Sequence, residues 1–102
     1  MIRLKQGVRL RDLSPQMALA AAIVASCYGD FDCTITSAND SKHSARSYHY
    51  KGNALDFRTK DYAGDKAALE RRVREALGAE FDAILEALGQ DNEHLHVEYD
   101  PK

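Results

Sequence analysis

The strongest folding signal in the sequence is an Ala-rich helix pattern that follows Ser14 and Pro15. Serine at the N-cap and proline at the first helical position are a preferred opening of a helix. Apolar residues then recur every three to four positions as far as Gly29, forming one face: Met17, Ala20, Ala21, Val24 and Tyr28. Because several of these side chains are small, the face can pack closely against a sheet. The pattern therefore favours a fold in which a helix covers a sheet.

Short segments typical of strands flank a second helix pattern. Asp65 can cap a helix that runs to Leu77 and ends at Gly78. The strand candidates, which are β-branched or apolar at alternate positions, are residues 33–36, 54–58, 81–85 and 95–99. Residues 37–47 are polar and predict a loop. This order predicts one α+β domain over residues 1–102, with a small, mainly antiparallel sheet and helices packed on one side.

Size and charge limit the classes of function. The 102 residues suit one core, and the net charge of −2 provides no basic field for nucleic acid. The longest apolar stretch, residues 17–26, is too short to span a bilayer, and residues 1–13 lack the apolar run of a signal peptide. We expect a monomer that is made in the cytoplasm, with no nucleic-acid partner and no membrane insertion.

The two cysteines, Cys27 and Cys33, are expected to be reduced, partly buried thiols. A disulfide between Cys27 and Cys33, across residues 29–32, is the alternative if the protein reaches the periplasm. A zinc-binding pair is disfavoured, because a spacing of six matches no common cysteine motif.

The histidines carry the main chemical signal. His94 and His96 lie two apart in a predicted strand, so they share one face with Glu98. His49 precedes Asp56 by seven residues, at a junction between loop and strand. A catalytic zinc site uses three protein ligands, often histidine and carboxylate, and keeps one position open for water. His49, Asp56 and His96 would supply such a set.

Taken one by one, these residues have simpler interpretations. A single surface histidine is more often solvated than a ligand. Asp56, between Leu55 and Phe57, is equally consistent with a buried, hydrogen-bonded structural carboxylate. The case for a metal site therefore depends on the residues occurring together.

Two local patterns bring them together. Residues 47–56 read Ser-Tyr-His-Tyr-Lys-Gly-Asn-Ala-Leu-Asp, which fits S-x-H-x-x-G-x-A-x-D, and residues 93–96 read Glu-His-Leu-His, which fits both E-x-x-H and H-x-H. The chain thus resembles the zinc peptidase family of D-Ala-D-Ala carboxypeptidases, D-Ala-D-Ala dipeptidases and phage L-alanyl-D-glutamate endolysins. The hedgehog signalling domain shares the same metal fold. The resemblance covers roughly residues 10–100.

The resemblance implies a hedgehog/D,D-peptidase-like fold and a role for each matched residue. His49, Asp56 and His96 correspond to the Zn²⁺ ligands. Glu93 corresponds to the general base, and His94 to an auxiliary catalytic group beside the metal. Strand alternation points Glu93 to the opposite face, so it reaches the site only where the chain turns into the strand.

Other residues are candidates for the general base and for binding the substrate's negative charge. His94 and Glu98 are the next candidates if Glu93 is not the base. Arg46 is the first choice for stabilising an oxyanion or holding a substrate carboxylate, and Lys42 is the second. His43 is expected to be a solvated loop histidine.

Together these features predict a zinc metallopeptidase, a hydrolase that cleaves an amide bond in peptidoglycan stem peptides of the D-Ala-D-Ala or L-Ala-D-Glu type. A phage- or prophage-encoded endolysin, released to the cell wall by a holin or carried in a virion, suits the sequence, as does a cytoplasmic dipeptidase. One alternative is a non-catalytic, zinc-stabilised binding module of the same fold. Another is a small interaction protein without metal.

Overall fold

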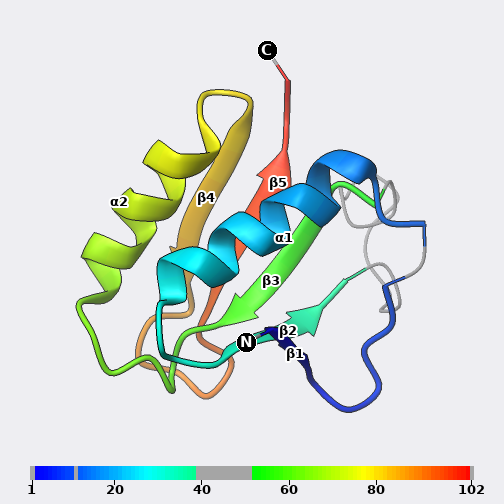
Figure 1. The fold of residues 1–102 in the computed structure, drawn as a ribbon. Helices are drawn as coiled ribbons and strands as arrows, with labels where there is room; N and C mark the ends of the chain where they lie inside the picture. Colours follow the sequence, from blue (N-terminus) through cyan, green and yellow to red (C-terminus); the bar gives the residue numbers. More distant parts are fainter. Residues whose placement is uncertain (1, 11, 39–51, 102) are drawn as a thin grey trace.

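The computed structural model describes residues 2–10, 12–38 and 52–101. In these residues five strands form one mixed sheet in the order β1-β2-β3-β5-β4 (Figure 1). The strands are β1 (Ile2–Leu4), β2 (Cys33–Ser37), β3 (Ala54–Arg58), β4 (Phe81–Glu86) and β5 (His94–Tyr99). β1 runs parallel to β2, and the other neighbouring strands are antiparallel.

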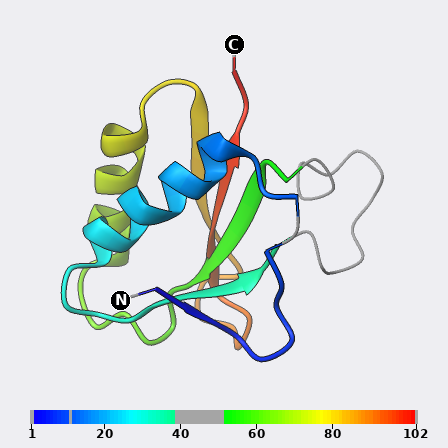
Figure 2. The same ribbon diagram turned by 45° about the vertical axis from the view of Figure 1, so that its right-hand side comes forward.

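Two helices, α1 (Pro15–Tyr28) and α2 (Lys66–Leu77), lie on one face of this sheet (Figures 1 and 2). Both begin at the predicted caps. The Ser14 side chain accepts a hydrogen bond from the Met17 amide, and Asp65 accepts one from the Ala68 amide, each at 3.1 Å. Both predicted helices are therefore confirmed.

The core lies between the helices and the sheet. Side chains alternate along β2, β3, β4 and β5, and the inward ones pack with the apolar faces of α1 and α2. In the neighbouring strands β3 and β5 these buried residues are Leu55, Phe57, Leu95 and Val97. The intervening residues, among them Asp56, His94 and His96, point to the face that the helices leave uncovered. We call this face the open face.

The α+β class and the one-sided helix layer agree with the sequence prediction. The strand β1 was not predicted. Its three residues alternate charged and aliphatic side chains, all are exposed, and its parallel pairing depends on β2 rather than on a local pattern.

Both cysteines are free thiols, Cys27 partly exposed and Cys33 buried. Burial raises the pKa of the Cys33 thiol to about 12, so this group stays protonated and serves as an apolar core residue. Among the described residues, no helix has the length and apolar content needed to cross a membrane.

Candidate functional site

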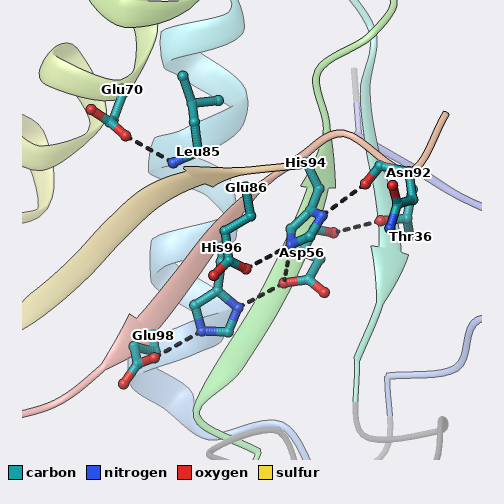
Figure 3. Close-up of polar contacts among 9 residues, drawn as sticks. All are labelled: Thr36, Asp56, Glu70, Leu85, Glu86, Asn92, His94, His96 and Glu98. Atoms are coloured by element: carbon teal, nitrogen blue, oxygen red, sulfur yellow. Dashed lines mark hydrogen bonds and ion pairs between the residues drawn. The ribbon is translucent and has the colours of Figure 1, made fainter. Parts of the chain in front are cut away.

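Asp56 on β3 and His96 on β5 face each other across neighbouring strands. They are direct partners in the β3–β5 register, and Asp56 Oδ1 lies 2.8 Å from His96 Nδ1. Thr36 on β2 donates a hydrogen bond to the Asp56 carbonyl oxygen at 3.4 Å, beside an irregularity in the β2–β3 pairing (Figure 3). Two of the three predicted zinc ligands are thus brought into contact.

Both ring nitrogens of His96 meet carboxylates. Nδ1 lies beside Asp56, and Nε2 lies 2.8 Å from Oε1 of Glu98, the next residue on the open face. Since an ionised carboxylate can only accept hydrogen bonds, this arrangement favours a proton on each nitrogen. The hydrogen bond to Asp56 is the largest of the effects that raise the pKa of His96 to about 9, against the opposing effect of burial.

His94 is held in a similar way, one step along the same strand. Its Nδ1 donates to the Asn92 carbonyl oxygen at 2.9 Å, and its Nε2 lies 2.9 Å from Glu86 Oε1 and 3.8 Å from Asp56 Oδ1 (Figure 3). Burial lowers the pKa of His94, but the hydrogen bond to Asn92 and the charges of Asp56 and Glu86 outweigh it and raise the pKa. Carboxylates and imidazoles therefore alternate across three strands.

The donor chemistry of this row suits a divalent transition metal. Imidazole nitrogens and carboxylate oxygens are the ligands that zinc accepts, and Asp56 and His96 are only 18% exposed or less. In the described part of the chain, three possible ligand atoms lie within 4.8 Å of one another only at Asp82, Glu98 and Asp100. Because acidic groups on a surface often gather without a metal, that cluster is weak evidence for a site.

Glu93 lies apart from this row. It precedes β5 directly and shares the covered side with Leu95 and Val97, only 4% exposed. Its Oε2 accepts hydrogen bonds from Thr59 Oγ1 at 2.5 Å and from Lys66 Nζ at 2.7 Å. Burial alone would raise the pKa of Glu93, but these contacts lower it to about 2. The structure thus brings Glu93 together with Lys66, and not with His94 and His96.

Gly52 has a tight position between the two predicted ligands His49 and Asp56. Its φ is +72°, and a Cβ added there would lie 2.0 Å from the Asp12 carbonyl oxygen. The Ser14 amide also donates to the Gly52 carbonyl oxygen at 2.9 Å. Only glycine therefore fits at this position, because a side chain would collide with the backbone that leads into α1.

Several predicted site residues lie outside the described residues: His49, Arg46, Lys42 and His43. The third zinc ligand and the proposed oxyanion group consequently stay predictions from the sequence.

Three residues around the site were not predicted from the sequence: Glu86, Thr59 and Lys66. Glu86 is the register partner of His94 across β4 and β5, which becomes visible only once the two strands are paired. Thr59 is a polar residue with no exposed surface, directly after a strand. A polar residue next to a predicted strand end was the one signal in the sequence that could have indicated a buried polar contact there.

Comparisons of the chain with protein-family models, with curated proteins and with solved structures return no match.

Proposed function

We propose that this chain is a zinc-dependent peptidase that hydrolyses an amide bond in peptidoglycan stem peptides. The observation that carries the proposal is the cross-strand contact of Asp56 with His96 on the open face. It unites residues from two sequence patterns that lie some forty positions apart. The hedgehog/D,D-peptidase-like fold belongs to the same proposal.

In this proposal His49, Asp56 and His96 hold the zinc ion, and His96 loses one of its two ring protons when it binds the metal. When bound, zinc supplies Lewis-acid chemistry that activates water and polarises a carbonyl group. His94, whose ring nitrogens lie beside the Asn92 carbonyl oxygen and the Glu86 carboxylate, is placed to give a proton to the leaving amine. Arg46 is proposed to hold a substrate carboxylate or an oxyanion.

The proton acceptor is best sought on the open face. Glu93 is engaged by Lys66 and Thr59 on the covered side, and its low pKa makes it a weak base. Glu98 lies beside His96 and is partly exposed, so its carboxylate has the better position. His94 would serve as the acceptor only after losing its own proton.

Metal analysis and digestion of purified peptidoglycan test the proposal together. We expect about one zinc ion per chain. Mass spectrometry of the digested muropeptides should show one class of cleaved amide, lost on treatment with EDTA and restored by zinc. A zinc function would be contradicted if the protein takes up no zinc at neutral pH, or if EDTA leaves its melting temperature unchanged.

The cleaved bond also separates the proposed biological roles. Release of material from cross-linked sacculi would support an endolysin that acts on the cell wall. Cleavage of free D-Ala-D-Ala alone would support a cytoplasmic dipeptidase.

One observation favours a second candidate, a zinc-stabilised binding module without catalysis. The acidic residue of the E-x-x-H pattern, Glu93, has its buried carboxylate in an ion pair with the partly exposed Lys66. Such a module would bind one zinc and retain a stem peptide in calorimetry while cleaving no muropeptide. The peptidase proposal expects turnover from the same preparation.

A further inference from the structure

Glu93 joins three separate segments of the chain through one buried carboxylate. Its Oε2 accepts hydrogen bonds from Thr59 at 2.5 Å and Lys66 at 2.7 Å, and its Oε1 accepts one from the Gly89 amide at 3.0 Å. Thr59 directly follows β3, Lys66 is the first residue of α2, and Gly89 lies in the turn between β4 and β5. All described partners of the carboxylate are thus on the covered side of the sheet or in the turn.

These contacts lie at the end of the β3–β5 ladder that bears His94. The register pairs Arg58 with His94 and, two residues further on, Asp56 with His96. Thr59 and Glu93 are the next residue on each strand, so their hydrogen bond extends this register beyond its last strand pair. A shift of one residue between β3 and β5 would move the histidines to the other face.

The same junction fixes the turn that orients His94. The Gly89 amide donates to Glu93, and the Glu93 amide donates to the Gln90 carbonyl oxygen at 3.1 Å. Asn92, whose carbonyl oxygen accepts from His94 Nδ1, belongs to this turn. The Glu93 carboxylate therefore restrains the residue that holds the ring of His94.

We propose that Glu93 is a positioning residue, which acts through His94 and the Asp56–His96 pair rather than on the substrate. The positioning itself is a property of the fold, while its effect on catalysis rests on the proposed peptidase function. The ion pair with Lys66 and the hydrogen bond from Thr59 hold the Glu93 carboxylate in this position. Loss of either partner should therefore disturb the histidines in the way that loss of the Glu93 charge does.

The test compares Glu93→Gln with Lys66→Met and Thr59→Val. The side-chain ¹⁵N resonances of His94 and His96 are recorded by NMR, zinc affinity is measured by competition with a chelator, and muropeptide hydrolysis is followed over pH. Lys60→Met is the matched control, because Lys60 is an exposed lysine in the turn after Thr59. Circular dichroism checks that each variant folds.

If Glu93 is a positioning residue, Glu93→Gln and Lys66→Met shift the same histidine resonances and lower kcat by a similar factor of about ten. The double variant is then no worse than either single variant. The acid limb of the pH profile of kcat/KM persists in Glu93→Gln, and Lys60→Met behaves as the wild type. Should Glu93→Gln fail to fold, Lys66→Met and Thr59→Val provide the comparison.

Two results would overturn the proposal. If Glu93 were instead the general base, Glu93→Gln would lower kcat by about a hundredfold or more and abolish the acid limb of the pH profile, while Lys66→Met would stay nearly fully active. Histidine resonances that do not move in Glu93→Gln, Lys66→Met and Thr59→Val would equally exclude positioning. The NMR arm needs no turnover, so failure of the proposed peptidase function, seen as an inactive wild type, is distinguished from failure of this inference.

Discussion

Asp56 and His96 are direct register partners on adjacent antiparallel strands, with Asp56 Oδ1 2.8 Å from His96 Nδ1. In antiparallel pairs the side chains of facing residues are close neighbours, so the backbone pairing itself brings the carboxylate to the imidazole. No long or flexible side chain has to be ordered for this contact. Two ligand candidates are therefore fixed by the sheet, which is the rigid support that a metal site needs.

If Asp56 and His96 hold zinc, Asp56→Asn and His96→Ala each lower the zinc affinity by about a hundredfold or more. The asparagine amide lacks the negative charge with which the Asp56 carboxylate binds the metal ion. Alanine at position 96 removes the imidazole nitrogen that binds it. Elemental analysis after dialysis against a weak chelator measures the loss. Muropeptide hydrolysis should fall with zinc content in both variants.

Asp82→Asn is the control for this experiment. Asp82 is an exposed carboxylate of the cluster with Glu98 and Asp100, and it lies on the same face of the sheet. Its loss should leave zinc content unchanged. Zinc lost from Asp82→Asn but retained by Asp56→Asn would instead place the metal at the acidic cluster.

The buried Glu93 carboxylate should give the fold an acid-sensitive component. Its pKa of about 2 lies below the ordinary 4.5, so the stabilisation is fully present above about pH 5 and is lost as the pH falls toward 2. The loss is on the order of 3 kcal/mol. Urea unfolding at a series of pH values should show this slope in the wild type and a flatter one in Glu93→Gln. Equal slopes would mean that other carboxylates dominate the acid response.

Much of the fold could be predicted because its signals are local. The caps Ser14 and Asp65 and the apolar periods that follow them define both helices, and alternation of polarity predicts strands such as Ala54–Arg58. The strand β1 was missed because its pairing depends on a partner distant in sequence.

The candidate site was predictable only in part, for the same reason. Period two places His94, His96 and Glu98 on one face, and the alternation also predicts Glu93 on the other. The contact of His94 with Glu86 depends on the β4–β5 register, and that of Glu93 with Lys66 depends on where α2 packs. Neither the register nor the packing of α2 is encoded in a local pattern.

The close approach at Gly52 predicts a costly substitution. Alanine there combines a left-handed backbone with a Cβ 2.0 Å from the Asp12 carbonyl oxygen, so Gly52→Ala should destabilise the fold by roughly 2–4 kcal/mol. Gly7→Ala is the matched control, because Gly7 has a φ of +90° with nothing within 4 Å of the added Cβ. It should cost only about 1 kcal/mol. Equal losses in urea unfolding would show that backbone strain, and not the contact with Asp12, is what matters.

The outer edge of β4 is covered by two side chains of α2. Arg74 Nε donates to the Ala83 carbonyl oxygen at 2.7 Å. The Leu85 amide donates to Glu70 Oε2 at 2.8 Å, as Figure 3 shows. Arg74 and Glu70 also lie within 3.8 Å of each other, as an ion pair along the helix. They satisfy backbone groups that another strand would otherwise pair with.

Glu70→Ala with Arg74→Ala should therefore promote self-association through β4 relative to the wild type. Sedimentation velocity at increasing concentration measures this, with a dimer or larger species expected for the double variant alone. Arg71→Ala with Glu75→Ala is the matched control, because it removes the same two charges from exposed positions of the same helix. If both double variants stay monomeric, the two side chains are not what keeps the edge from pairing. If both associate, the cause is the lost charge on α2 and not the uncovered backbone of Ala83 and Leu85.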